Sequence, residues 1–469
     1  MNRHTTEKTD DEQPSFLERV IFRKVELWLV GIVVIFMLAL TVVFGAVVRN
    51  ELQGHNKFGI AGDVALRVAE IPSTIRELKR QKLRLHADQM GKRFAGHSGW
   101  EIPDPSRVAG LDGYLLLSRV DGDKSRQIVE LVDLRDFRVL HRWEPDAESL
   151  FAGLKTCPNC LLDFANWTFR TIHPFAFENG DILVKDHGSP LARIDACGKP
   201  VWVNSNMFHH ATELDENGDI WSPGYIWGPG LERPADRRED YHNDTIMHAT
   251  ADGRTVAQYD LTDILMKNGY GYLLMGMNEI YHKDPLHPND VQPVMSDGTY
   301  WKKGDVFVSL RNKSTVFLFR PSTEKILWLK TGPWAVQHDV DILGDGKIAI
   351  FDNGFHPDVM TAPDDVANQV MIYDFATDQI TSPYLDILSR LEVRTATEGL
   401  AEFIPGGYVM LEETNFGRLV FIGPDGELAA QYVNSGSDGT NYLLDWSRYI
   451  PRGPGDMVAA AVASAACGG

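Results

Sequence analysis

The stretch DGKIAIF at residues 345–351 is a glycine-containing turn followed by a short apolar strand, and versions of it recur along the chain. The other versions are DGYLLL at 112–117, NGDILV at 179–184, NGDIW at 217–221, GDVFVSL at 304–310 and GGYVML at 406–411. Turns of this composition between runs of β-forming residues are typical of antiparallel hairpins. The chain is therefore built from a repeated β unit.

A second hairpin follows each of these turn-and-strand elements. The six hairpins are LVDLRDFRVLHRW (131–143), RIDACGKPVWV (193–203), MHATADGRTVAQY (247–259), FLFRPSTEKILW (317–328), MIYDFATDQI (371–380) and VFIGPDGELAAQY (420–432). Six similar units with up to four strands each predict an all-β, six-bladed β-propeller over residues 106–450, with insertions near 222–245 and 265–300. A β-sandwich or a two-domain β protein would not account for six similar units.

An apolar segment precedes the repeats. Leu27 to Val48 is a charge-free run of 22 residues, long enough to cross about 30 Å of hydrocarbon. The apolar core of a cleaved signal peptide is usually shorter, about 7–15 residues. The sequence therefore favours an uncleaved transmembrane signal anchor over 27–48, with a cleaved signal peptide as the alternative.

The charges beside this segment predict its orientation. Basic residues are slightly more numerous before the run than after it. Arg19, Arg23 and Lys24 precede it, and Arg49 and Lys57 follow it. By the positive-inside rule, residues 1–26 lie in the cytoplasm and the large domain lies on the outer side.

Two further segments flank the repeats. Residues 49–105 are expected to form a helical stalk, because apolar residues recur at helical spacing over 62–95, with a break near Pro72. The tail 451–469 ends in GDMVAAAVASAACGG, a stretch of low complexity that we expect to be disordered.

Composition narrows the classes of partner and the use of cysteine. The formal net charge is −19, which argues against nucleic acid as a partner, because phosphates are bound by Lys and Arg. Of the four cysteines, Cys157 and Cys160 form a C-P-N-C pair that predicts a local structural disulfide. Cys197 lies in a hairpin and Cys467 lies in the tail.

Several histidines occupy a common phase of the repeat. His338 stands seven residues before the first turn residue of its unit, and His210 and Glu398 stand at the same distance in theirs. His173 stands one residue nearer its turn. Equivalent positions of blades meet around the propeller axis, so these side chains are expected to face one end of the channel.

The residues around these histidines predict an oxyanion site. They lie in the short patterns F-H-H (208–210), H-P-N (287–289), S-L-R-N (309–312) and Q-H-D (337–339). Arg311 offers a fork of donors to sulfate or phosphate oxygens, and Asn289 adds a neutral donor. A neutral histidine can act as a nucleophile. Three histidines can also bind zinc or iron, but the nearby arginine would repel a metal ion, so no metal or other cofactor is expected.

Residues 281–354 resemble the bacterial arylsulfate sulfotransferase family. The segments that carry the resemblance are YHKDPLHPND, GDVFVSLRNKSTVFLF and WAVQHDVDILGDGKIAIFDNG. The resemblance implies a six-bladed propeller in which His338 is the nucleophile that becomes transiently sulfated. It implies that His287, Asn289 and Arg311 hold the sulfuryl oxygens and that His210 assists proton transfer, with His209 as the alternative in register.

The resemblance also implies an activity, whereas the apolar segment, in which this chain departs from a mostly secreted and soluble family, implies the location. The expected reaction moves a sulfuryl group from an aryl sulfate to a phenolic or other hydroxyl acceptor, without a nucleotide sulfate donor and by ping-pong kinetics. The expected location is the bacterial inner membrane, with a single span and a periplasmic propeller that meets a second copy or another envelope protein. The alternatives are a non-catalytic binding or assembly propeller in the cell envelope and, from STEKILW at 322–328, a quinoprotein-like oxidoreductase.

Overall fold

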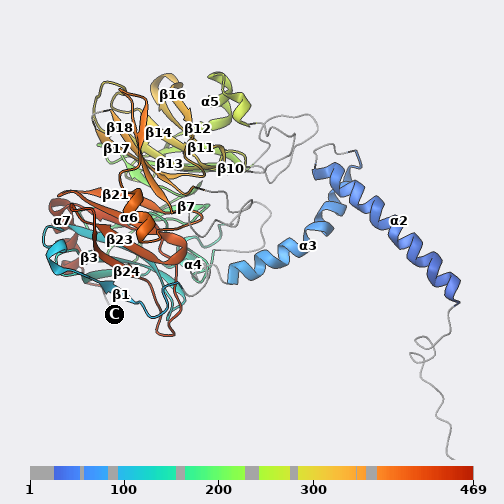
Figure 1. Ribbon diagram of the computed structural model, residues 1–469, viewed down its shortest axis with the longest axis horizontal. Coiled ribbons are helices and arrows are strands. Elements are labelled where there is room, and N and C mark those ends of the chain that lie inside the picture. Colours follow the sequence, from blue (N-terminus) through green and yellow to red (C-terminus); the bar gives the residue numbers. More distant parts are fainter. Residues whose placement is uncertain are drawn as a thin grey trace, which may run out of the picture. The chain divides into compact units, whose positions relative to one another are not determined.

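The computed structural model describes residues 26–52, 57–82, 93–154, 164–227, 242–274, 284–344, 346–354 and 367–467 (Figure 1). The chain divides into two compact units, Met1–Pro72 and Ser73–Gly469. Cys157 and Cys160 lie outside the described residues, so the local disulfide expected between them stays a prediction.

The described part of the N-terminal unit contains one helix that is apolar throughout most of its length. Helix α2 (Leu27–Leu52) has a mean hydropathy of 2.9 in its most apolar window, none of which is buried, and is long enough to cross a membrane. A helix of this kind near the N-terminus is typical of a membrane anchor or of a signal sequence. Helix α3 (Ile60–Lys82) confirms the helix expected there, but it continues through Pro72 instead of breaking.

The strands of the described residues form five hydrogen-bonded sheets. The first contains β25 (Arg448–Ile450), β2 (Tyr114–Asp121), β3 (Arg126–Asp133) and β4 (Arg138–Trp143). The second contains β5 (Phe175–Ala176), β6 (Ile182–Val184), β7 (Ser189–Ile194), β8 (Pro200–Phe208), β10 (Ile220–Trp227), β11 (His242–Ala249) and β12 (Thr255–Asp260), with β9 (Glu213–Leu214) paired to β10.

The other three sheets each come from one continuous stretch of chain, apart from one added strand. The third contains β13 (Pro288–Pro293), β14 (Val306–Leu310), β15 (Thr315–Arg320) and β16 (Lys325–Thr331). The fourth contains β17 (His338–Gly344), β18 (Lys347–Asp352), β19 (Gln369–Asp374) and β20 (Gln379–Thr381). The fifth contains β21 (Leu400–Ile404), β22 (Tyr408–Glu413), β23 (Arg418–Ile422) and β24 (Leu428–Val433), with β1 (Gly99–Glu101) added to β24.

Short helices lie between the strands. The α-helices are α4 (Ala147–Leu150), α5 (Leu261–Lys267) and α6 (Leu385–Arg390), and the 3-10 helices are η1 (Pro105–Val108), η2 (Gly271–Leu274), η3 (Arg311–Lys313), η4 (Pro321–Thr323) and η5 (Thr414–Phe416). Three of them, η3, η4 and η5, form the tight turns of hairpins, and each ends at a residue of positive φ.

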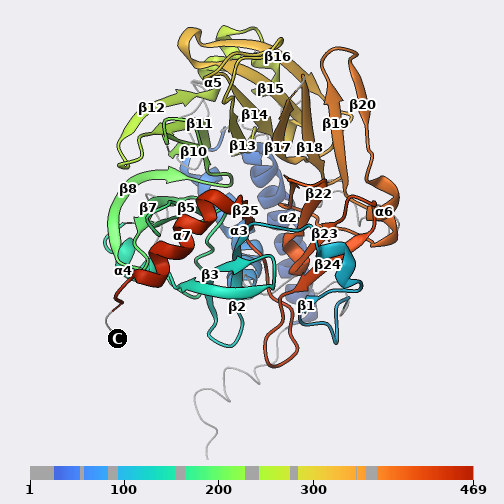
Figure 2. The same cartoon turned by 90° about the vertical axis from the view of Figure 1, so that its left-hand side faces the viewer.

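The sheets surround a common centre, as in a propeller (Figure 2). Both ends of the repeat region close the ring. The late strand β25 pairs with β2, where Tyr114 faces Ile450. The early strand β1 pairs with β24, where Trp100 faces Tyr432. The sheet region therefore begins at Gly99 rather than at 106.

The mostly β, propeller-like architecture is confirmed, but hydrogen bonding gives five sheets where six separate blades were expected. The difference lies in the second sheet. There β8 pairs with β10 through Gly224–Phe208 and Tyr225–Met207. Two successive four-strand units are thus joined into one eight-stranded sheet.

The packing explains why the strands are almost continuously apolar. Neighbouring residues of a strand point to opposite faces, and each sheet is covered on both faces by its neighbours. In β14, Val306 and Val308 pack into the core shared with β11 and α5. Phe307, which lies between them, packs into the core shared with Ile348 and Ile350 of β18.

The C-terminal segment is folded, so the disorder expected over 451–469 is wrong for the described part of it. Helix α7 (Arg452–Ser464) buries Val458 and Val462 in the core beside Trp143 of β4. Beyond the helix, Cys467 forms a disulfide with Cys197 of the β7–β8 turn. The segment was mistaken for a disordered tail because its composition is of low complexity. Alanine, however, is the strongest helix former, and Val458 and Val462 lie on one face of the helix.

Candidate functional site

The loops that carry the expected site residues converge because their strands are neighbours. Strand β9 contacts β13, β13 contacts β17, β17 contacts β21, and β21 contacts β25. These are edge strands of their sheets or, for β9, a strand added to β10. Residues at the starts of these strands are therefore brought together from distant parts of the sequence.

A residue with positive φ stands within three residues of the start of each of these five strands and of β5. The six residues are His173 (φ 47°), His210 (51°), His287 (53°), Asp339 (53°), Glu398 (63°) and Trp446 (57°). The left-handed conformation costs a non-glycine residue about 1–2 kcal/mol, and strained residues of this kind cluster at functional sites. His210 and Glu398, which share the repeat phase, thus share this conformation, whereas beside His338 it is the next residue, Asp339, that adopts it.

Three of the expected site histidines lie side by side. The ring centroid of His210 is 4.8 Å from that of His287 and 6.1 Å from that of His338. Two more histidines join them. His187, from the β6–β7 turn, lies 4.3 Å from His210, and His209 lies 5.0 Å from it. The ring of Trp446 lies 6.0 Å from His338, edge to face. We call these five histidines the histidine cluster.

The ring of His338 is held at both nitrogens. Its Nδ1 lies 2.7 Å from Oδ1 of Asn353, and its Nε2 accepts the backbone N–H of Glu398 at 3.2 Å. The amide group of Asn353 donates to the carbonyls of Thr395 and Glu398, so its oxygen must be the group that faces the ring. Nδ1 therefore carries the proton, and Nε2 carries the lone pair.

The histidine cluster is electrically neutral near neutral pH in four of its members. Burial lowers the pKa of His187 and holds the pKa values of His209, His210 and His338 well below their usual range. For His338 the charge of Arg311 adds to this effect. A buried imidazole without a proton on Nε2 is a nucleophile in its active form.

Arg311 is held against the loop that carries His287. The backbone N–H of Arg311 donates to the carbonyl of His287 at 3.1 Å. Its guanidinium donates to Oδ1 of Asn312 at 2.8 Å, and Asn312 in turn donates to the carbonyl of Asp284 at 2.9 Å. Nδ1 of His287 is hydrogen-bonded to Oδ2 of Asp284. The S-L-R-N and H-P-N patterns thus form one network.

Asn289 is fully buried and supports the segment that carries His338. Its Nδ2 donates to the carbonyl of Gln337 at 2.7 Å, and Gln337 donates to Ser309 at 2.9 Å and to the carbonyl of Leu310. The expected ligand-binding amide of Asn289 is therefore also a support for the backbone. Its second N–H is the one that could reach a ligand.

A buried ion-pair group lies behind the histidine cluster. Arg170 donates to both carboxylate oxygens of Glu398, at 2.9 and 2.7 Å, and also pairs with Asp445. His187 adds a hydrogen bond to Glu398 at 2.6 Å. Burial alone would raise the pKa of Glu398, but Arg170 and His187 hold it well below its usual range. Burial raises the pKa of Asp445 to about 8, because one guanidinium cannot compensate two buried carboxylates.

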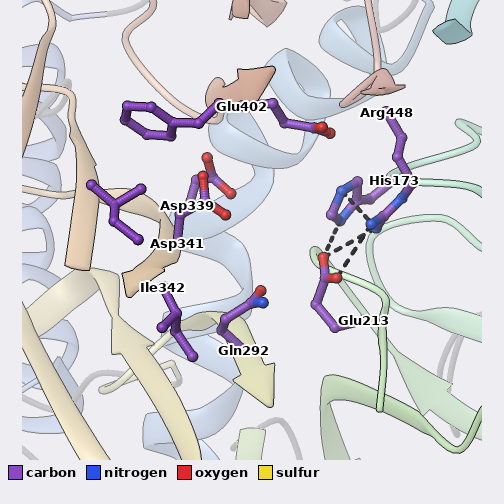
Figure 3. A pocket seen from close by; sticks show the side chains of 10 residues that line it. His173, Glu213, Gln292, Asp339, Asp341, Ile342, Glu402 and Arg448 are labelled. Atoms are coloured by element: carbon purple, nitrogen blue, oxygen red, sulfur yellow. Dashed lines mark hydrogen bonds and ion pairs between the residues drawn. The ribbon is translucent and has the colours of Figure 1, made fainter. Parts of the chain in front are cut away.

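An acidic cavity of about 190 Å³ lies further along the same central strands (Figure 3). Its charged and polar lining consists of His173, Glu213, Gln292, Asp339, Asp341, Glu402 and Arg448. Arg448 pairs with Glu213 at 3.1 Å and lies 2.7 Å from Nε2 of His173. Burial raises the pKa of Asp339 to about 7 and that of Glu402 to about 8. His173, although near the phase of His210, therefore belongs to this cavity and not to the histidine cluster.

The described residues give little support to a metal in the histidine cluster. Among them, the only group whose metal-ligand atoms all lie within 4.8 Å of one another is Asp215, Asp219 and His248. That group is partly exposed and lies outside the cluster. The cluster is better suited to an anion, which Arg311 would attract.

The sequence reasoning missed several members of the site. His187 lies outside every repeat phase, and no pattern marks it. Asp284 lies within the segment YHKDPLHPND quoted above, and Asn353 lies at the end of WAVQHDVDILGDGKIAIFDNG. Their roles nevertheless depend on hydrogen bonds between loops. Only the structure brings such loops together.

Comparison with known proteins identifies one family. Residues 173–435 match the model of a family described as Arylsulfotransferase (ASST). This match covers more than half of the chain, and no curated protein matches.

Solved structures give distant similarities. A protein of unknown function from Bacteroides caccae is 10% identical over 72% of this chain and 99% of its own, with a TM-score of 0.44. Virginiamycin B lyase from Staphylococcus aureus is 11% identical over 56% of this chain and 70% of its own, with a TM-score of 0.33. A Myceliophteria thermophila Cps50 (Swd1) β-propeller domain is 10% identical over 74% of this chain and 99% of its own, with a TM-score of 0.36. Similarities at these scores carry no functional weight.

Proposed function

Because this chain belongs to the arylsulfotransferase family, we propose that it moves a sulfuryl group from an aryl sulfate to a phenolic or other hydroxyl acceptor, without a nucleotide donor. The observation that carries the proposal is the convergence of three distant histidines, with Arg311 acting on His338. A binding protein for sulfate would need the arginine. It would not need a buried neutral imidazole whose reactive nitrogen is selected by a hydrogen bond.

In the proposed mechanism Nε2 of His338 attacks the sulfur of the aryl sulfate. The sulfur–oxygen bond to the aryl group breaks, and its electron pair leaves with the phenolate oxygen. The sulfuryl group stays on Nε2 until an acceptor oxygen attacks the sulfur and returns the electron pair to the imidazole. The two similar half-reactions give ping-pong kinetics.

The surroundings of His338 favour an anionic group that gains charge in the transition state. Arg311 supplies positive charge, and the second N–H of Asn289 supplies a neutral donor. The backbone N–H of Glu398, which bonds Nε2 at 3.2 Å, can turn to a sulfuryl oxygen once Nε2 is sulfated. The nearby Glu398 carboxylate does not repel the substrate strongly, because Arg170 neutralises it.

We also infer that the propeller has six blades. The eight-stranded sheet has its own internal core, in which Leu183 and Leu191 of one half pack with Ile220 and Met247 of the other. Two halves that pack face to face are two blades. The six residues of positive φ, one for each central strand, support the same count.

For the location, we propose that α2 stays attached as an anchor in the bacterial inner membrane, with the propeller in the periplasm. This rests on the length and hydropathy of the apolar span Leu27–Glu51 and on the basic residues that precede it. An anchored enzyme would meet envelope hydroxyl acceptors as well as free phenols, and its protein partner would be a second copy or another envelope protein.

The proposed chemistry is tested by intact mass spectrometry after brief mixing with 4-nitrophenyl sulfate. The wild-type protein should gain the mass of one sulfuryl group and lose it when phenol is added. His338→Ala should gain none, whereas His97→Ala, whose ring is half exposed and pairs with Glu101, should behave like the wild type. An adduct that persists in His338→Ala would contradict the proposed nucleophile.

A further inference from the structure

His287 and His338 differ in the partner that holds Nδ1. For His338 the partner is the neutral amide oxygen of Asn353, whereas for His287 it is the carboxylate of Asp284. A carboxylate beside an imidazole stabilises the protonated ring, and a neutral amide does so far less. The two rings are therefore prepared for different tasks.

The position of Asp284 is fixed by the structure around it. Its backbone carbonyl accepts the side-chain N–H of Asn312 at 2.9 Å, and Asn312 also accepts from Arg311. The following residues are fixed as well, because Asp244 accepts the backbone N–H groups of Leu286 and His287. Burial and the neighbouring carboxylate of Asp284 raise the pKa of Asp244 well above its usual range.

The hydrogen bond to Asp284 selects the nitrogen of His287 that can meet substrate. With Nδ1–H donated to the carboxylate, the neutral ring of His287 carries its lone pair on Nε2, on the side away from Asp284. The ring lies 4.8 Å from that of His210, which in turn lies 6.1 Å from that of His338. A neutral His287 oriented in this way accepts a proton and does not donate one from Nε2.

We propose that Asp284 positions His287 as the group that transfers the proton at the phenolic oxygen in both half-reactions. This inference rests on the proposed sulfuryl transfer and gives His287 a different task from holding sulfuryl oxygens. Asp284 does not touch the substrate and acts through His287. The arrangement matches that of a carboxylate that orients a catalytic histidine.

The proton balance is the same in the two half-reactions. When Nε2 of His338 displaces a weakly acidic phenol, protonated His287 gives its Nε2 proton to the leaving oxygen and becomes neutral. When the acceptor arrives, neutral His287 takes the proton from the acceptor hydroxyl as the oxygen attacks the sulfur. No net proton is gained or lost, and no other reactant is needed.

The test separates the two half-reactions with donors and acceptors of different acidity. 4-Nitrophenolate leaves without being protonated, so Asp284→Asn should keep the rapid release of nitrophenol from 4-nitrophenyl sulfate. Transfer from the sulfated protein to phenol should fall about 10²-fold, as expected for loss of a general base. The loss should shrink as the acceptor phenol becomes more acidic. Asp219→Asn is the matched control, since Asp219 pairs with His248 outside the site.

The outcomes divide clearly. If the wild type forms no adduct, the proposed function fails. If the wild type reacts but Asp284→Asn loses both half-reactions equally, or loses neither, or loses transfer equally for all acceptors, the role of Asp284 is overturned. If Asp284→Asn does not fold, His287→Gln decides by the same criteria, because glutamine cannot take up the proton.

Discussion

At the residue scale, the site combines a neutral histidine, the proposed nucleophile His338, with the nearby guanidinium of Arg311. His338 is buried to 1% exposure, and its pKa is held low by burial first and by Arg311 second. The same guanidinium that we propose to bind the sulfuryl oxygens thus helps to keep the imidazole of His338 unprotonated. Removing Arg311 should therefore change both the rate of nitrophenol release and the pH dependence of that rate.

Arg311→Ala is expected to lower the rate of nitrophenol release about 10²–10³-fold, as for loss of an oxyanion donor. It should also move the acid limb of that rate to higher pH. In the wild type a lowered pKa means that His338 gains its proton only well below pH 6.5, and removing a nearby positive charge raises that pKa. Pre-steady-state rates measured from acid to neutral pH check both effects.

Arg254→Ala is the control, because the guanidinium of Arg254 is exposed on a surface turn. It should change neither the rate nor the acid limb. A slow Arg311→Ala variant whose acid limb has not moved would show that Arg311 binds substrate without setting the protonation of His338.

The site could be predicted in part because the histidines share a repeat phase. That phase singled out His210 and His338, and the short patterns added His287, Asn289 and Arg311. It also pointed to His173, which the structure places at the acidic cavity. Asp284 and Asn353 determine which ring nitrogen of their histidine carries the proton. Their hydrogen bonds depend on which strands lie side by side in the fold, and no local sequence pattern indicates that arrangement.

At the element scale, the turn-and-strand repeats predicted individual strands well, since glycine turns and apolar runs are local signals. Segment ends were predicted less well. Helix α7 was expected to be disordered because its alanine-rich sequence resembles a low-complexity tail, although its valines lie one helical turn apart. The disulfide between Cys197 and Cys467 spans 270 residues. At such a separation the sequence does not indicate which cysteines will pair.

The proposal for helix α2 predicts that the protein stays with membranes. In a bacterial host it should resist extraction by high salt and be released by detergent, because its apolar window is uncovered in its own unit. Leu38→Arg places a charge near the middle of α2, at a cost of about 2.5–3.5 kcal/mol, and should weaken insertion. Val64→Arg on the exposed surface of α3 is the control.

Protease added outside spheroplasts tests the orientation. It should digest the propeller of the wild type if residues 1–26 are cytoplasmic. A shortened, soluble protein in the periplasm would show instead that α2 is a cleaved signal sequence, and a protected propeller would reverse the orientation.

At the scale of the whole molecule, closing the ring brings carboxyl groups from three central strands, β9, β17 and β21, into one cavity. Glu213, Asp339, Asp341 and Glu402 line it with Arg448, and like charges in a confined space raise one another's pKa. A fold of this kind is most stable while some of these groups remain protonated. The acidic cavity was not foreseen from the sequence, because its members alternate with apolar residues on strands that meet only in the closed ring.

Glu402→Gln should therefore become more stable relative to the wild type as the pH rises. The pKa of Glu402 is raised to about 8, chiefly by burial, above its value in the unfolded chain. Its contribution to stability is thus complete below the unfolded pKa and is lost as pH rises through about 8. Each unit of such a shift corresponds to about 1.4 kcal/mol. The amide keeps the shape of the side chain and removes this titration.

Urea unfolding of both proteins between about pH 6 and about pH 9 measures the difference. The comparison is needed because Lys185, with a pKa lowered to about 7 by burial, acts in the opposite direction in this window in both proteins. The buried histidines of lowered pKa act in the same direction as Lys185 at the acidic end of this window, again in both proteins. Glu427→Gln, at an exposed pair with Arg390, should show no such trend. A stability difference for Glu402→Gln that is constant with pH would mean that Glu402 is already charged in the folded ring and that Arg448 alone compensates the cavity.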